Sequence, residues 1–165
     1  MRVVGIDPGT ARTGFAVIEE TPVGFETVEL GVIKTSASTD ATVRLLELHE
    51  AVAGLLERSR PDAVALERVY FQVNARSAIQ VGQASGVILL AAARRGVPCF
   101  GYSPNEVKMA ICGYGGADKE QVMRMTKKLL GGAGRHIEPD AADAAAVAVA
   151  HLNSYKVKNA LGGTS

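Results

Sequence analysis

The sequence predicts an α/β domain built on a mixed five-stranded sheet with helices on both faces. Up to residue 33 the chain holds three short apolar or alternating segments joined by brief turns, which favours an antiparallel meander. From residue 45 onward, helical periodicity alternates with short apolar strands, as in parallel strands joined by helices. With 165 residues, of which 47% are hydrophobic and 21% charged, the chain suits one folded domain.

The three N-terminal strands are short and are separated by turn-forming residues. The segments are Val3–Asp7, Thr13–Glu19 and Glu26–Ile33. Pro8 and Gly9 close the first segment with turn chemistry. In the third segment Val28, Leu30 and Val32 recur at every second position, so we expect them on one face of the sheet.

Helices and strands alternate in the rest of the chain. We expect, in order, a helix over Leu45–Leu56 that ends near Pro61, a strand at Ala63–Glu67, a helix from about Asn74 to Arg95, a strand at Val97–Tyr102, a short helix after Ser103 that Gly113 ends, a helix after Asp118 and a final helix from Pro139 to about Asn153. Ser103 and Glu106 have the spacing of a capping box, with Pro104 in the first turn. Asp118 with Gln121 begins the next helix.

The chain is expected to form a single domain over residues 1–153, followed by a flexible tail at 154–165. The tail is polar and contains Gly162 and Gly163 near its end. The first strand starts at residue 3 without a leader-type segment before it, and no apolar run reaches membrane-spanning length. We therefore expect a cytoplasmic protein.

Cysteine, histidine and net charge say little about function. Cys99 and Cys112 lack the paired spacing of zinc ligands and are expected to be free thiols, and the three histidines form no cluster in sequence. The net charge of +1 is a weak argument for nucleic-acid binding, since such domains are often clearly basic. A cluster of catalytic acids would, however, cancel several basic residues in that sum.

Two acidic residues end predicted strands. Asp7 closes the first strand, and Glu67 closes the strand that starts at Ala63. A carboxylate at the end of a buried apolar strand costs free energy unless it is paired or binds a cation. Each residue also has a structural explanation, because Asp-Pro-Gly is turn chemistry and Glu67 can pair with Arg68. Alone, neither residue decides between these interpretations.

Two further acids, Asp140 and Asp143, lie three residues apart at the start of the last helix. That spacing puts their side chains on one helix face, with Cβ atoms about 5–6 Å apart. Val147 and Ala150 continue the same stripe, which indicates that the acids extend the face packed against the sheet. The alternative is that Asp140 is an ordinary N-cap, since the first turn of a helix favours negative charge.

Two strand-end acids and two inward-facing helical acids would meet at one edge of the sheet. Carboxylates so close together repel unless cations hold them. Hard oxygen ligands suit Mg²⁺ or Mn²⁺, and four carboxylates can hold two ions about 3.5–4 Å apart. This is the two-metal arrangement that hydrolyses phosphodiesters, in which no nucleophilic side chain is needed.

Four segments of the chain resemble the motifs of RuvC-type Holliday junction resolvases, in the same order and at similar separations. They are Gly5–Thr10 with Thr13 and Gly14, Leu66–Phe71 followed by Asn74 and Arg76, Gly82–Val87, and Pro139–Ala144. The resemblance spans roughly residues 1–152, and the four motifs together are far more specific than one would be. It implies a five-stranded RNase H-like fold with three antiparallel and two parallel strands. It also implies paired, symmetric, metal-dependent cleavage of four-way DNA junctions.

The resemblance also assigns residues to roles. The family's acidic quartet falls on Asp7, Glu67, Asp140 and Asp143, as catalytic residues and ligands of Mg²⁺ or Mn²⁺. An aromatic residue thought to engage bases near the junction centre falls on Tyr70, and Phe71 adjoins it. A ring there can stack on an unpaired base, although a core or dimer contact is the alternative, above all for Phe71.

Basic residues complete the implied DNA-binding set. The family's two DNA-contacting lysines fall on Lys108 and Lys119, and Arg76 is a further candidate for binding phosphate. Arg12 is a weaker candidate that we leave out of the set. The chain departs from the familiar pattern at Tyr70, where phenylalanine is common, and at Arg68, which puts the sequence preference in doubt.

The family resemblance implies a homodimer and a branch-migration helicase complex of the RuvA and RuvB type as partners. A two-fold dimer presents two like sites to a junction of approximate two-fold symmetry. The small residues Gly82 and Gly86 make the helix around them a candidate for the dimer interface. Close packing of that helix on the monomer's own sheet is an equal alternative.

Three other functions compete with this interpretation. An actin-like ATPase or sugar kinase shares an Asp-x-Gly-Thr pattern, but 165 residues cannot hold its two halves. A different RNase H-like nuclease acting on structured RNA fits Lys108, Lys119 and Tyr70 less well. A non-catalytic junction-binding protein would not need four acids in register.

Overall fold

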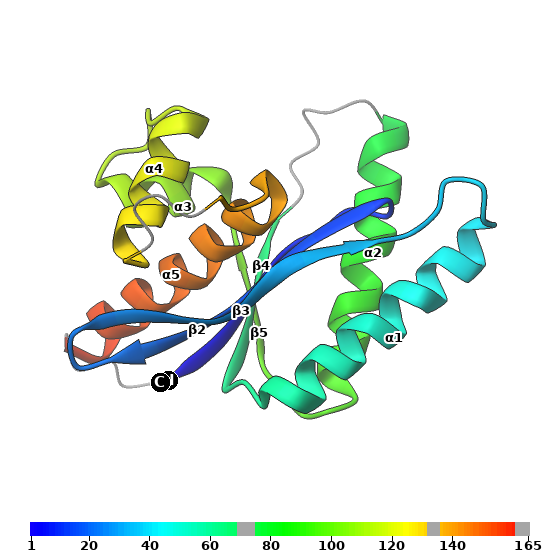
Figure 1. The fold of residues 1–165 in the computed structure, drawn as a ribbon, viewed down its shortest axis with the longest axis horizontal. Coiled ribbons are helices and arrows are strands. Elements are labelled where there is room, and N and C mark those ends of the chain that lie inside the picture. The colour runs from blue at the N-terminus through cyan, green and yellow to red at the C-terminus, as the bar shows by residue number, and fades with distance from the viewer. Residues whose placement is uncertain (69–74, 132–135, 161–165) are drawn as a thin grey trace.

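The computed structural model describes residues 1–68, 75–131 and 136–160, and only the backbone of 75–77 and 156–160. A single five-stranded sheet runs through the middle of the molecule, with helices on both sides (Figure 1). In chain order the elements are β1 (Arg2–Asp7), β2 (Arg12–Thr21), β3 (Gly24–Lys34), α1 (Ala41–Ser59), β4 (Ala63–Glu67), α2 (Ala75–Ala93), β5 (Cys99–Tyr102), α3 (Pro104–Cys112), α4 (Lys119–Leu129) and α5 (Pro139–Ala160). The predicted order of elements is confirmed.

The strand order β3-β2-β1-β4-β5 confirms the predicted mixed sheet. β1, β2 and β3 pair antiparallel, whereas β4 pairs parallel with β1 and with β5. In the β1–β4 pair, Ile6 lies opposite Leu66. Because these two strands run in the same direction, the residues that follow, Asp7 and Glu67, end side by side at one edge of the sheet.

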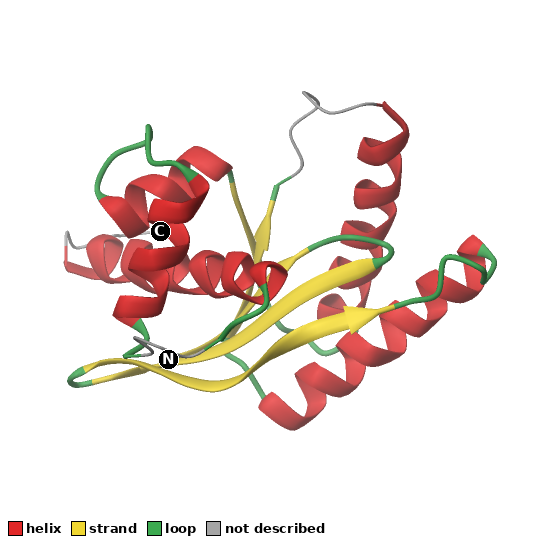
Figure 2. Ribbon diagram, turned by 45° about the horizontal axis from the view of Figure 1, so that its top comes forward, coloured by secondary structure: helices red, strands yellow, loops and turns green. Residues whose placement is uncertain are grey.

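The two faces of the sheet carry different helices (Figure 2). α5 lies across one face and is itself covered by α3 and α4, while α1 and α2 pack together on the other face. The core is divided accordingly. One cluster joins α5 to Val3, Ala16 and Ala65, and another joins α1 and α2 to Val4 and Leu66. A third, smaller cluster packs the start of α5 against β3.

The sequence prediction was wrong for one face of β3. Glu29 pairs with Val17 and Thr27 pairs with Ile18, so a bulge leaves Val28 between them without a partner in the register. Val28 is 48% exposed, while Leu30 packs against the α5 cluster. A single inserted residue interrupts the period-two alternation that strand patterns rely on.

The last helix is longer than predicted. α5 continues to Ala160, so residues 154–160 of the expected tail are helical. Gly162 is the first helix-breaking residue after Pro139, and Tyr155 stacks on His151 one turn earlier, with ring centroids 6.1 Å apart. Both features favour continuation of the helix beyond Asn153.

The helix caps on the α5 side confirm the sequence signals. Ser103 and Glu106 form a full capping box at the start of α3, and Gly113 ends that helix in the left-handed conformation. Asp118 and Gln121 form a second capping box at the start of α4. These caps fix the starts of the two helices that carry Lys108 and Lys119. No helix in the described ranges combines the length and the apolar character needed to cross a lipid bilayer.

Candidate active site

Asp7 and Glu67 lie next to each other at the carboxyl ends of two central parallel strands. Both side chains face the α5 side of the sheet, since Gly5 and Ala65, two residues before each, contact or join the α5 cluster. Burial raises the pKa of Glu67, the charge of Asp143 adds to the rise, and the interactions with Asp7 and Lys119 oppose it.

Asp140, in the first turn of α5, and Asp143, three residues later, reach the same sheet edge. The close packing of α5 on β1 and β2 makes this possible. An added Cβ at Gly14 would collide with the backbone carbonyl of Asp140, and one at Gly5 would collide with that of Ala144. Because only glycine lets the helix backbone come so near, these two glycines set how closely Asp140 and Asp143 approach the strands.

The electrostatics of Asp7 show that all four acids are close enough to interact. Burial is the largest cause that raises the pKa of Asp7, and repulsion from Glu67, Asp143 and Asp140 adds to it. Lys119 opposes the rise, and the resulting pKa is about 7. The raised pKa shows that the negative charge of the four acids is only partly compensated by nearby positive charge.

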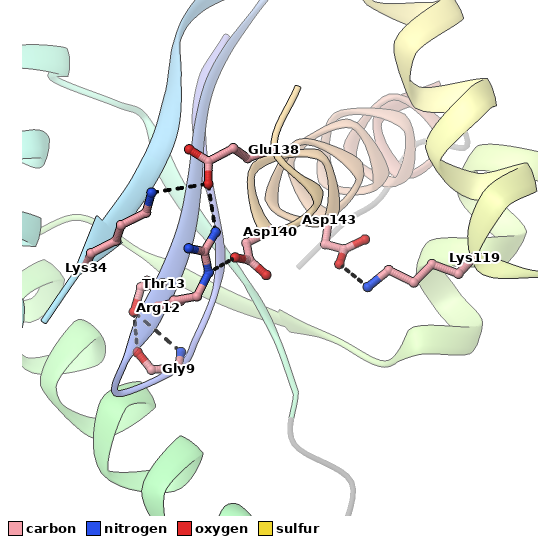
Figure 3. A network of polar contacts seen from close by, with 8 residues as sticks. All are labelled: Gly9, Arg12, Thr13, Lys34, Lys119, Glu138, Asp140 and Asp143. Carbon is pink, nitrogen blue, oxygen red and sulfur yellow. Dashed lines mark hydrogen bonds and ion pairs between the residues drawn. The ribbon is translucent and has the colours of Figure 1, made fainter. Parts of the chain in front are cut away.

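Lys119 supplies part of that charge. Its Nζ lies 2.7 Å from Oδ2 of Asp143, and the interaction raises the pKa of the lysine (Figure 3). The amine belongs to an exposed side chain at the first residue of α4. A cavity of about 170 Å³ between α3, α4 and α5 is lined by Lys108 and Lys119 together with Glu67 and Asp143. Both predicted lysines thus lie beside the acids.

A second ion-pair group flanks the acids on the opposite side. Arg12, the first residue of β2, donates from Nε to Asp140 Oδ2 at 2.6 Å and from a terminal nitrogen to Glu138 Oε2 at 2.7 Å (Figure 3). Lys34 Nζ lies 3.4 Å from the same oxygen of Glu138. Sequence reasoning placed Arg12 outside the site and did not consider Glu138, although a glutamate just before the helix-starting Pro139 was visible.

The turn between β1 and β2 is fixed by its own hydrogen bonds. Thr13 Oγ1 donates to the carbonyl of Gly9 at 2.5 Å and accepts from the N–H of Gly9 at 3.4 Å (Figure 3). This turn joins Asp7 to Arg12, so its rigidity places an acid and a flanking cation at the same time.

The donor set fits a divalent cation in charge and in chemistry. Carboxylate oxygens are the ligands that Mg²⁺ and Mn²⁺ prefer, and the raised pKa of Asp7 reports negative charge that a cation would relieve. As the side chains stand, no three acidic, histidine or cysteine groups within the described ranges form a metal-binding cluster. Asp140 is engaged by Arg12 and Asp143 by Lys119 in this arrangement.

Three predicted DNA-binding residues cannot be placed. Tyr70 and Phe71 lie outside the described residues, and the side chain of Arg76 is likewise not described. Gly5 and Gly14 were part of the quoted motifs, but their role in the approach of α5 was not foreseen. Glycine inside an otherwise apolar strand is the signal that could have indicated it.

Comparison with known proteins gives consistent results. The family described as crossover junction endodeoxyribonuclease RuvC matches residues 3–151. A protein of that name from Syntrophomonas wolfei is 42% identical over 161 residues, which cover 98% of this chain and 94% of the relative.

Solved structures show the same similarity. The fold matches the structure of Thermus thermophilus RuvC with a TM-score of 0.89 and 36% identity, covering 95% of this chain and 96% of the other. A structure of T. thermophilus RuvC in complex with a Holliday junction substrate matches with a TM-score of 0.87 and 34% identity over the same shares. The yeast mitochondrial Holliday junction resolvase, at 15% identity and a TM-score of 0.70, shares the fold.

Proposed function

The chain belongs to the RuvC family of crossover junction endodeoxyribonucleases, and we propose that Asp7, Glu67, Asp140 and Asp143 form its catalytic centre. The protein is a structure-selective endonuclease that resolves four-way DNA junctions. Family membership sets aside the ATPase, the RNA-directed nuclease and the non-catalytic binding protein as interpretations of the sequence. The observation that carries the catalytic assignment is the convergence of four carboxylates at one sheet edge, where Asp7 and Glu67 end neighbouring parallel strands and the acids at the start of α5 interact with Asp7.

The family requires a divalent metal, and we propose Mg²⁺, with Mn²⁺ as a substitute and two ions per site. The four acids are the residues that would hold them. When bound, such ions supply a hydroxide nucleophile and stabilise the leaving 3′ oxygen. The chain contributes a half-buried cluster of acids in which Asp7 must lose its proton before it can act as a ligand.

Lys119 and Lys108 are proposed to bind the phosphates beside the cleaved bond. Both side chains line the cavity next to Glu67 and Asp143, where a DNA backbone would approach the acids. The side chain of Lys119 is 70% exposed, so its amine can exchange Asp143 for a phosphate at little cost in desolvation. Each lysine would neutralise one phosphate charge and add to the salt dependence of binding.

The segment after Glu67 is proposed to contact the junction centre. Tyr70 and Phe71 would stack on unpaired bases, and Arg76 would bind a phosphate. The support for these three roles is the sequence resemblance, in which they follow Glu67 along the chain.

We also propose a homodimer that uses the outer face of α2. Ile79, Gly82, Gly86 and Leu90 follow one another at helical spacing on that face. Ile79 is 63% and Leu90 54% exposed, and a Cβ at either glycine would have no neighbour within 4 Å. These glycines therefore do not pack on the monomer's own sheet, which favours the interface over the alternative. A second α2 could approach closely along this stripe.

The remaining parts of the proposal follow from family membership. A branch-migration helicase complex of the RuvA and RuvB type would deliver the junction, and the reaction would take place in the cytoplasm. The sheet and its helices would act as one nuclease domain, whose last helix extends past the expected boundary at residue 153.

A labelled mobile four-way junction tests the function. The protein is incubated with the junction with and without Mg²⁺, and the products of both strand pairs are resolved. Paired nicks at symmetric positions, formed only with the metal, are expected. Asp7→Asn serves as the control for the site. Cleavage by Asp7→Asn at the parent rate, or cleavage without a divalent ion, would contradict the metal mechanism.

A further inference from the structure

Arg12 and Lys34 place two positive charges next to each other, and Glu138, just before α5, pairs with both. The two residues are direct cross-strand partners on β2 and β3. Like charges in directly opposite positions destabilise a strand pair. Here Glu138 accepts from Arg12 at 2.7 Å and pairs with Lys34 at 3.4 Å, so an acid beside α5 compensates both cations. The arrangement directs two positive side chains from the sheet to the first turn of the catalytic helix (Figure 3).

Arg12 differs from Lys34 in also holding Asp140. Its guanidinium spans two acids, one just before α5 and one in the first turn, with a separate N–H for each. A planar fork with several donors can do this, whereas a lysine amine has no fixed fork. Both contacts pull in the same direction, so Arg12 ties the start of α5 to the start of β2.

The contact leaves one carboxylate oxygen of Asp140 available. Oδ2 accepts from Arg12 Nε at 2.6 Å, and no hydrogen bond to Oδ1 occurs from the described residues. The bond to Oδ2 favours one orientation of the Asp140 carboxylate, in which Oδ1 stays available for another ligand. Hydrogen bonds of this kind orient metal ligands, and losing them commonly weakens metal binding by about 10–100-fold.

We propose that Arg12 is a positioning residue that orients Asp140 to bind a divalent cation through its second oxygen. This inference rests on the proposed function, because it takes Asp140 as a metal ligand. In this proposal the Arg12 guanidinium helps Asp140 to bind the metal ion. A guanidinium that merely competed with the metal for Asp140 would have the opposite effect on affinity.

Titration with Mn²⁺, followed by electron paramagnetic resonance of the free ion, tests the proposal without DNA or turnover. Arg12→Leu is expected to weaken Mn²⁺ binding by about tenfold or more, and Arg12→Lys to recover part of the loss. Lys34→Gln is the matched control, because it removes a cation from the same group but no contact to Asp140. Its affinity is expected to stay within about twofold of the parent.

The outcomes separate the inference from its premise. If Arg12→Leu binds Mn²⁺ as tightly as the parent, or more tightly, Arg12 does not position Asp140. If the parent binds no Mn²⁺, or if Asp7→Asn binds Mn²⁺ as well as the parent does, the proposed metal site itself is wrong. Thermal melts in EDTA establish that the variants are folded. Should Arg12→Leu not fold, Glu138→Gln weakens the anchor of Arg12 and is expected to lower the affinity by a smaller factor, and unchanged affinity there would overturn the proposal.

Discussion

The two faces of the sheet are packed with different kinds of side chain. On the α5 face, alanines and two strand glycines meet, so that the helix backbone nearly touches β1 and β2. On the α1–α2 face, large side chains such as Leu48, Leu55 and Ile88 fill the space between helices and sheet. Small residues bring backbones together, whereas large ones bury more apolar area per residue.

The difference indicates that one face of the sheet mainly positions the acids, whereas the other mainly stabilises the fold. On the α5 face, alanine and glycine bury less apolar area per residue than larger side chains would. Their close packing fixes the distance between the acids of the helix and those of the strands. The α1–α2 face supplies stability, and α2 carries the proposed dimer stripe on its outer side. Substitutions on the first face should therefore change catalysis more than stability, and those on the second should do the reverse.

The largest effect is expected at Asp7. Asp7→Asn should lower junction cleavage by on the order of a thousandfold, since it removes a ligand and a charge from the centre of the acids. The same change should stabilise the metal-free protein at pH 8, because a neutral amide is not repelled by Glu67. Chemical denaturation and junction cleavage, measured on the same preparation, test both expectations. Glu47→Gln, an exposed change on α1, should alter neither.

The sign of the pH effect follows from the raised pKa. Asp7 has a pKa of about 7 in the folded protein against 3.8 in the reference state, so the folded state holds the proton more tightly. The metal-free protein should lose stability as pH rises from about 4 to 7, and Asp7→Asn should remove that loss, by roughly 2–4 kcal/mol. If Asp7→Asn is less stable than the parent at pH 8, ionised Asp7 does not destabilise the metal-free protein.

Two core substitutions, one on each face of the sheet, test this difference between the faces directly. In Gly5→Ala the new methyl would meet the Ala144 carbonyl and lie 2.8 Å from the Ala148 Cβ, which displaces α5. We expect a loss of about 1–3 kcal/mol and a rate of cleavage reduced by at least tenfold in the folded protein. Leu48→Ala should cost about 2–5 kcal/mol but leave the rate per folded molecule within about twofold. Equal losses of rate in both variants would contradict the comparison.

A smaller effect is expected on the outer side of α2. Leu90→Lys places a charge on the proposed dimer stripe and should shift the protein toward a monomer without changing the thermal stability of each subunit. Sedimentation velocity at several concentrations measures the shift. Arg94→Gln, at an exposed position just after α2, should leave the oligomeric state unchanged, and a Leu90→Lys protein that stays as large as the parent would argue against this interface.

The smallest effect is expected for Lys108. Lys108→Gln should weaken junction binding a few-fold and reduce the slope of log affinity against log salt by about one, as expected for one lost phosphate contact. Binding measured with Ca²⁺ over a range of salt concentrations gives the slope. A slope that is unchanged would place Lys108 outside the DNA interface.

The sequence predicted the order of strands and helices well because its signals are local. The capping residues Ser103 and Asp118, and the turn after Asp7, act within a few residues of themselves. The bulge at Val28 was missed, since it depends on how β3 pairs with β2 rather than on the composition of β3. The end of α5 lies beyond the predicted one because the polar residues after Asn153, which are also typical of a tail, permit a helix.

The site could be predicted only in part, for a similar reason. Strand ends and helical spacing predicted that the four acids would converge, and the family resemblance implied their catalytic roles. The role of Arg12 depends on a contact across 128 positions of the chain, which no local pattern reports. The close approach at Gly14 likewise depends on which helix covers β2. Contacts between distant segments are the part of a site that residue spacing leaves undetermined.

Anomalous diffraction from a crystal soaked in Mn²⁺ tests the central claim most directly. The account predicts two anomalous peaks about 3.5–4 Å apart, within about 2.0–2.4 Å of oxygens of Asp7, Glu67, Asp140 and Asp143. Peaks elsewhere, or no peak while Asp143 remains paired with Lys119, would contradict it.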